Sequence, residues 1–196
     1  MNRTPAVVVS FLMLWIPSGL LAKAATSRII IRGSDLNTPI EISDPKVLKD
    51  FRVWAGPGTS SNEGQSLIID WSQGMIGAPP KDLQRYSVSF YVQLAPEKYG
   101  LVYKVLYAYD TSRGKGYVYL PGEADDGYGL NVRSIVHFVE GHWFHAWKVW
   151  DSVARPLLQD AKETSSRNLD FGCNFRHKST SCGSGDTWRF RATCST

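Results

Sequence analysis

The sequence predicts a single α+β domain, in which an antiparallel β-meander sheet of five to seven strands packs against one C-terminal helix. In residues 86–94, apolar and polar side chains alternate with the period of two that is typical of a strand with one buried face. Two further β-rich segments, 101–109 and 117–120, follow after short turns, as in an antiparallel meander. The helix is indicated by three tryptophans at helical spacings of four and three: Trp143, Trp147 and Trp150.

The chain begins with the features of a secretory signal peptide. Arg3 precedes an apolar run at residues 6–21, and Ala22, Lys23 and Ala24 form the small-x-small pattern of a cleavage site. The run has about sixteen residues, fewer than the roughly twenty that a spanning helix needs. We therefore expect cleavage after Ala24 or Ala25, no stable membrane insertion afterwards, and a secreted or periplasmic protein.

The first elements of the mature chain are predicted from turn and capping signals. Residues 28–32 and 40–42 are β-branched runs separated by turn residues, which predicts a hairpin. Asp44 and Pro45 then have the pattern of an N-cap and first helical residue, so a short helical turn is expected over 45–51. Residues 55–65 are rich in Gly, Pro and Ser and predict a loop. It contains neither a Walker motif nor GxGxxG, and we expect no cofactor.

Three later elements complete the predicted domain, which spans residues 26–163. Residues 66–71 and 130–139 are apolar enough for two more strands. The tryptophan-rich helix is expected from about Trp143 to Lys162. Pro156 lies inside it, cannot donate a backbone hydrogen bond, and is predicted to kink or break the helix.

The last segment, 164–196, differs in composition and is predicted to be a peripheral basic tail, either disordered or tied by a disulfide. It contains all the cysteines of the chain, Cys173, Cys182 and Cys194. In an exported protein, one disulfide among these cysteines is plausible, and three alternative pairings can form it. The remaining thiol stays free, is buried, or links two chains as a disulfide-bonded dimer.

The charge balance argues against a nucleic-acid partner. The formal net charge of the full chain is +4, and removal of residues 1–25 takes away Arg3 and Lys23 and no acid, leaving +2. The body of the chain has no basic patch interleaved with stacking aromatic residues. We therefore expect no binding to nucleic acid.

Four sequence segments carry a resemblance to known proteins: RYSVSFYV, GKGYVYLPG, LNVRSIV and GHWFHA. Together they resemble segments of uncharacterised exported proteins of bacteria, and the similarity spans about residues 29–158. That group has no assigned activity. The resemblance therefore implies a bacterial, extracytoplasmic setting and no particular chemistry.

The polar residues around the start of the predicted helix offer a candidate metal site. His142 and His145 are three residues apart, so two imidazoles on one helical face can hold a divalent ion with Glu140. His137 and the acids of residues 123–126 lie nearby in the sequence. The same acids, together with Asp70, are also candidates for the catalytic acid and base of a hydrolase. The spacing is not HExxH, and packing beside the tryptophans is the favoured role of the histidines.

Aromatic residues in or beside loops offer a second kind of site. Exposed Trp and Tyr side chains bind sugars and peptides, and four such residues lie in or beside predicted loops. Packing in the core is nevertheless the more common role of large aromatic residues. These candidates are Trp54, Trp71, Tyr99 and Tyr128. The sequence thus favours a non-enzymatic protein of the cell envelope or exterior with a glycan, peptide or protein ligand. The alternative is a hydrolase, with or without a metal, that uses the region of His142 and His145.

Overall fold

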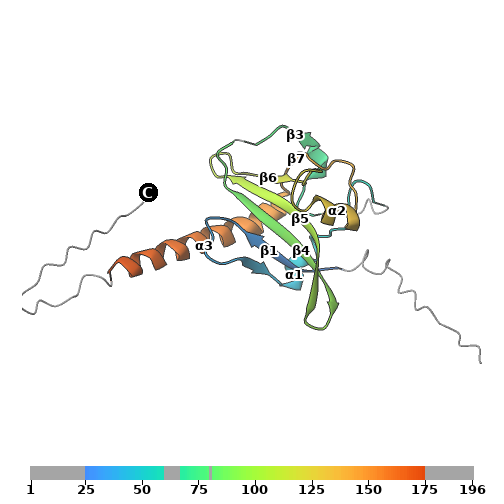
Figure 1. Ribbon diagram of the computed structural model, residues 1–196. Coiled ribbons are helices and arrows are strands. Elements are labelled where there is room, and N and C mark those ends of the chain that lie inside the picture. Colours follow the sequence, from blue (N-terminus) through green and yellow to red (C-terminus); the bar gives the residue numbers. More distant parts are fainter. Residues whose placement is uncertain (1–24, 60–66, 80, 175–196) are drawn as a thin grey trace, which may run out of the picture.

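The computed structural model describes residues 25–59, 67–79 and 81–174. These residues form one antiparallel seven-stranded sheet with a few helices, which confirms the predicted α+β class (Figure 1). The strand order is β2-β1-β4-β5-β6-β7-β3. The strands are β1 (Thr26–Arg32), β2 (Ile40–Ile42), β3 (Met75–Ile76), β4 (Arg85–Ala95), β5 (Lys98–Asp110), β6 (Lys115–Tyr119) and β7 (Trp143–His145).

The N-terminal elements form where the sequence predicts them. Strands β1 and β2 pair antiparallel, with Ile29 opposite Ile42. Helix α1 (Pro45–Leu48) follows, and the carboxylate of Asp44 accepts a hydrogen bond of 2.8 Å from the backbone N–H of Lys46. This cap satisfies one of the unpaired donors at the start of the helix. The predicted signal peptide lies outside the described residues except for Ala25.

The central meander is confirmed, with two register shifts between β4 and β5, after Phe90 and after Gln93. The pairing of β4 with β5 shifts register between Phe90, which lies opposite Tyr103, and Tyr91, which lies opposite Leu101. The extra residue, Val102, forms a β-bulge, so Val102 and Tyr103 are both buried while Leu101 is 38% exposed. The residues that alternate in β5 therefore face the core from Tyr103 onward, whereas Leu101 does not.

Two predicted strands have a different structure. Residues 67–69 are fully buried, but they form only an isolated bridge between Ile69 and Ala146, followed by the 3-10 helix η2 (Trp71–Gln73). Residues 130–139 do not form a strand, because helix α2 (Tyr128–Ser134) occupies their first half. In both cases a short apolar run is compatible with burial in several backbone conformations.

The tryptophan-rich helix begins later than predicted. Trp143 lies in β7, Trp147 precedes the helix, and only Trp150 belongs to α3 (Lys148–Asn174). The prediction of one helical stripe of three tryptophans is therefore wrong. Helix α3 continues through Pro156 without a break and extends beyond the predicted domain end at residue 163. Cys173 lies in α3, whereas Cys182 and Cys194 lie outside the described residues.

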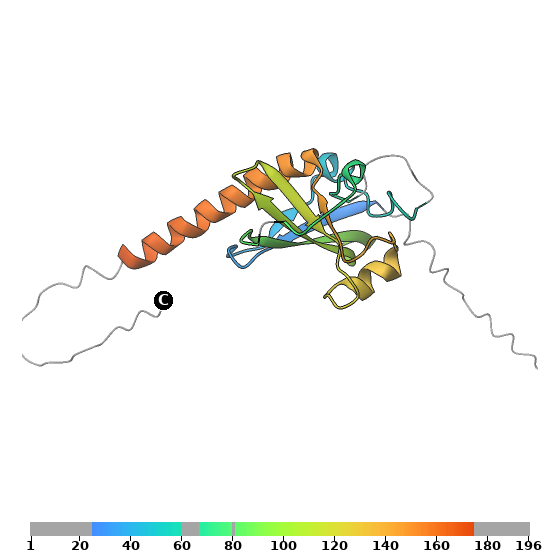
Figure 2. The same ribbon diagram turned by 90° about the horizontal axis from the view of Figure 1, so that it is seen from above.

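Helices α2 and α3 lie on opposite faces of the sheet. Figure 2 shows α3 along one face, which we call the inner face, and α2 on the other, the outer face. Trp150 of α3 is fully buried, with its ring edge-on to Phe51 at 5.3 Å and to Tyr107 at 5.8 Å between centroids. The hydroxyl of Tyr107 donates to Asp151 at 2.8 Å. Aromatic packing and this hydrogen bond thus fix the start of α3 on the inner face, as predicted for the helix as a whole.

Candidate functional site

The outer face of the sheet carries a row of side chains that no long helix covers. Strand pairing places Ser87 opposite Leu106, Leu106 opposite Tyr119, and Tyr119 opposite Trp143. Residues directly opposite one another in an antiparallel pair project to the same side of the sheet. Four neighbouring strands, β4 to β7, therefore contribute one row of polar and aromatic groups.

A pocket forms where the turn between β6 and α2 rises beside this row. Its cavity volume is about 300 Å³, which is at the small end of the range for ligand sites. The lining residues come from three strands and from the turn: Ser87, Lys104, Leu106, Tyr119, Pro121, Asp125 and Asp126. The pocket thus combines an apolar floor with hydroxyl, ammonium and carboxylate groups.

Tyr119 lines the pocket, and Trp143 packs beside Tyr119 outside the lining; we call these two residues the aromatic wall. Their ring centroids are 5.0 Å apart with an interplanar angle of 36°. Arg85 extends over the same wall, with its guanidinium carbon 5.5 Å from the centroid of the Trp143 ring. All three side chains retain exposure to solvent. Together they form a broad surface that stacks well against a flat or weakly polar ligand face.

Asp125 organises the turn that closes one side of the pocket. Its Oδ2 accepts hydrogen bonds from the Tyr119 hydroxyl at 2.7 Å and from the Gly122 backbone N–H at 2.8 Å. Partial burial raises the pKa of the Tyr119 hydroxyl, and the Asp125 carboxylate raises it further. Tyr119 is therefore protonated across the physiological range and acts as a donor to Asp125.

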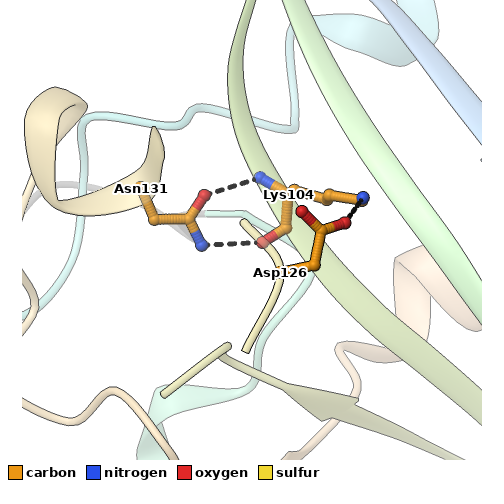
Figure 3. A network of polar contacts seen from close by, with 3 residues as sticks. All are labelled: Lys104, Asp126 and Asn131. Atoms are coloured by element: carbon orange, nitrogen blue, oxygen red, sulfur yellow. Dashed lines mark hydrogen bonds and ion pairs between the residues drawn. The ribbon is translucent and has the colours of Figure 1, made fainter. Parts of the chain in front are cut away.

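Lys104 and Asp126 form an ion pair at the edge of the pocket (Figure 3). The hydrogen bond from Lys104 lowers the pKa of the Asp126 carboxyl, and the charge of the lysine adds to this effect. Asn131 of α2 holds the backbone of Lys104 at the same point: its Oδ1 accepts from the N–H at 2.8 Å and its Nδ2 donates to the C=O at 2.7 Å. Helix α2 thus positions the residue that carries the ammonium group.

The residues predicted to hold a metal ion, Glu140, His142 and His145, lie in a loop and in strand β7. His142 is exposed and its Nδ1 lies 3.0 Å from the Glu140 carbonyl oxygen, whereas His145 lies on β7 and stacks on Tyr117. The Glu140 side chain accepts from the backbone N–H of His137 at 2.7 Å. These residues are not on one helical face, because their segment is a loop and a strand. Among the described residues, no three His, Cys, Asp or Glu side chains are grouped closely enough to hold a metal ion.

His137 is a packed core histidine. Only 1% of it is exposed, and its ring lies between Trp71 and Tyr103, with centroid distances of 5.4 and 5.8 Å. Nδ1 lies 2.6 Å from the Pro57 carbonyl oxygen, so Nδ1 carries the proton and donates to it. Burial lowers the pKa of the imidazole. His137 is therefore neutral at pH 7.

The four predicted aromatic residues do not line this pocket. Trp54 and Trp71 are partly buried and pack against the core, and Trp71 also lies edge-on to Phe144 at 5.1 Å. Tyr99 lies under the guanidinium group of Arg28, which is 3.9 Å from its ring centroid. Tyr128 is the first residue of α2. Asp70 caps η2 and accepts from Ser72, and Glu123 is exposed in the turn.

Sequence reasoning identified Asp125 and Asp126 but missed the aromatic wall. Tyr119 alternates with the buried residues Val118 and Leu120 in β6, so its outward direction was readable from the period of two. Trp143 was predicted to lie in the helix instead of in β7, so its position beside Tyr119 was not predicted. The partnership of Lys104 with Asn131 depends on contacts between distant segments and has no local signal.

Comparison with known proteins found no matching family, no matching curated protein and no matching solved structure. In the part of the chain that the structure describes, no helix is both long and apolar enough to cross a membrane.

Proposed function

We propose that this chain is an exported, non-enzymatic protein that binds a carbohydrate at the pocket on the outer face of the sheet. The single observation that supports this most is the stacked pair of Tyr119 and Trp143 beside the polar groups of the pocket. Aromatic rings pack on the C–H face of a sugar ring, and nearby polar groups fix its hydroxyls.

The charges around the pocket favour a neutral polyhydroxylated ligand over a strongly charged one. Arg85 and Lys104 contribute two positive charges, and Asp125 and Asp126 contribute two negative charges. Their sum is zero, while both donors and acceptors are present. Sugar hydroxyls both donate and accept hydrogen bonds, so they match such a mixed set.

The binding proposal is tested with purified mature protein on a glycan array, followed by titration calorimetry with the strongest glycan. We expect Trp143→Ala to weaken binding by about five- to twelvefold, since one lost stacking contact is worth roughly 1–1.5 kcal/mol. Tyr99→Ala, which removes an aromatic ring elsewhere on the sheet, is the matched control and should bind as the wild type does. An array without a bound glycan, or binding that Trp143→Ala leaves unchanged, contradicts the proposal.

Two further measurements test the other parts of the proposal. If the protein is non-enzymatic, the bound glycan is recovered intact after prolonged incubation, and release of a shorter product would favour the hydrolase alternative. If the chain is exported, N-terminal sequencing of protein produced with its leader in a bacterium begins at Ala25 or Thr26. An uncut N-terminus at Met1 would contradict export with cleavage.

A further inference from the structure

The row of side chains on the outer face is longer than the outer-face pocket. Beyond Ser87 it continues onto β1, where Arg32 lies directly opposite Ser87. At its other end it reaches the edge strand β3, where Ile76 lies opposite Trp143. We call the part from β1 to β7 the cross-strand row, and all its members retain exposure to solvent: Arg32, Ser87, Leu106, Tyr119 and Trp143. The pocket occupies only the middle of this row.

The cross-strand row is long enough for a chain of several sugar units. Neighbouring strands lie about 4.8 Å apart, so the four spacings from Trp143 on β7 to Arg32 on β1 amount to about 19 Å. One unit of an extended oligosaccharide is about as long as one strand spacing. A single sugar stacked on Tyr119 and Trp143 therefore does not reach Arg32, whereas a chain of about four or five units does.

Arg32 is an exposed cation, and it has no ion pair within the described residues. The two acids that follow it most closely in the chain bind other groups. Asp35 pairs with Lys162 at 3.0 Å, and Glu41 pairs with Arg28 at 3.0 Å. A guanidinium group is planar and presents paired N–H donors that match the oxygens of an anion. Arg32 thus adds one uncompensated positive charge beside a pocket whose own charges sum to zero.

We propose that the ligand of the outer face is an acidic oligosaccharide of about four or five units, which lies along the cross-strand row with one anionic group at its Arg32 end. Tyr119 and Trp143 stack on a neutral unit, and the polar groups of the pocket bind the hydroxyls of the units that follow. Arg32 binds the carboxylate or sulfate of the acidic unit. This assignment rests on the proposed carbohydrate function, whose ligand class it narrows. The neutral balance of the pocket fits a chain that is charged at one end only.

The test uses the purified mature chain and a glycan array with three matched series. These are neutral oligosaccharides of one to six units, the same chains with one terminal uronic acid, and the same chains with one terminal sulfate ester. We expect one of the two anionic series to bind more strongly than the neutral series, which also identifies the anionic group. Within that series the affinity should rise with length up to about four or five units, because a shorter chain does not span the row.

Variants are compared by titration calorimetry with the tightest anionic glycan and with its neutral counterpart. Arg32→Gln should weaken binding of the anionic glycan by about five- to tenfold and leave the neutral one unchanged, because it removes a charge-assisted hydrogen bond at an exposed position. Arg155→Gln is the matched control, since it removes an exposed arginine from α3 on the inner face. It should bind both glycans as the wild type does. Thermal unfolding of both variants confirms that the fold is retained.

The possible results separate this ligand class from the carbohydrate function itself. If neutral chains bind as tightly as anionic ones, or if Arg32→Gln keeps the wild-type affinity for the anionic glycan, the acidic ligand is wrong and the carbohydrate function stands. An equal loss of affinity in Arg32→Gln and Arg155→Gln also overturns the assignment, because it indicates a general attraction by positive charge. An affinity that does not rise beyond one unit excludes a ligand along the row. If no glycan binds, both proposals are wrong.

Discussion

Asn131 completes the hydrogen bonding of the Lys104 backbone at the point where β6 no longer reaches β5. The last pair of β5 with β6 joins Leu106 to Tyr119, and two residues earlier the carboxamide of Asn131 occupies the place of the missing strand. Ser134 of the same helix donates to the Val102 carbonyl at 2.5 Å. Side chains of α2 thus extend the ladder of β5 and also position the Lys104 side of the outer-face pocket.

Asn131→Ala should lower the free energy of unfolding by about 2–4 kcal/mol, because it leaves a backbone N–H and a C=O of Lys104 without partners in a buried place. Asn131 is fully buried. Urea denaturation of both proteins measures the difference. Arg133→Ala, an exposed position on α2, is the matched control and should stay within about 0.5 kcal/mol of the wild type. An Asn131→Ala protein as stable as this control would show that the two hydrogen bonds contribute little.

Gly116→Ala should also be destabilising, by about 2–3 kcal/mol, because there is no room for a methyl group at this position. A Cβ at Gly116 would overlap the Asp151 carboxylate and lie 2.8 Å from the Ala146 methyl group, so α3 would have to move away from β6. The measurement is thermal unfolding followed by circular dichroism. Gly77→Ala adds the same methyl group where no atom lies within 4 Å and should change the stability little. Equal melting temperatures for the two variants would contradict this account.

The tryptophans separate into core and surface residues, which single substitutions can verify. Trp150→Ala should cost about 3–5 kcal/mol, since the ring is fully buried against Phe51 and Tyr107. Trp143→Ala should cost only about 1–2 kcal/mol, because that ring is partly exposed on the outer face. Chemical denaturation of both variants gives the two values. A Trp143→Ala protein as unstable as Trp150→Ala would instead support a shared core role.

The sheet was predictable from the sequence because its central strands have one buried face. Tyr86, Val88, Phe90 and Val92 are buried as the alternation predicts, although Ser89 is buried as well and Leu94 is 45% exposed. The hairpin of 28–32 with 40–42 is marked by its turn residues. The start of α3 was not predictable in the same way. Trp143 and Trp147 fit a helical spacing by coincidence, since Trp143 lies in β7 beside Tyr119 on the outer face, whereas Trp147 follows β7 and packs against the core. Spacing alone does not distinguish these cases when the run is short.

The candidate site was predictable only in part. The acidic turn is visible in the sequence, and it does provide two carboxylates to the pocket. The pairing of Tyr119 with Trp143 depends on the register of β6 with β7, and the pairing of Lys104 with Asn131 depends on the packing of α2. Both are contacts between segments that are separated by more than twenty residues, and they follow from the tertiary arrangement.

Stability should fall as the pH is lowered below the ordinary imidazole pKa of 6.5, because His137 is buried in its neutral form. Burial lowers the pKa of His137 in the folded state, while the Pro57 carbonyl and the Glu140 carboxylate oppose this shift only in part. Below pH 6.5 the unfolded chain therefore binds a proton that the folded chain does not. The free energy of unfolding then decreases by at most about 1.4 kcal/mol per pH unit, down to the folded-state pKa.

Urea denaturation between about pH 5 and pH 7 measures this dependence, and His137→Gln isolates it, because its side chain does not titrate in that range. The buried carboxyl of Asp151, whose pKa burial raises, acts in the opposite direction, since it binds its proton more readily in the folded state. That contribution is common to both proteins and cancels in their difference. His142→Gln replaces an exposed histidine and should keep the slope of the wild type. If the slope of His137→Gln equals that of the wild type, then another group accounts for the pH dependence, and the neutral core role of His137 is wrong.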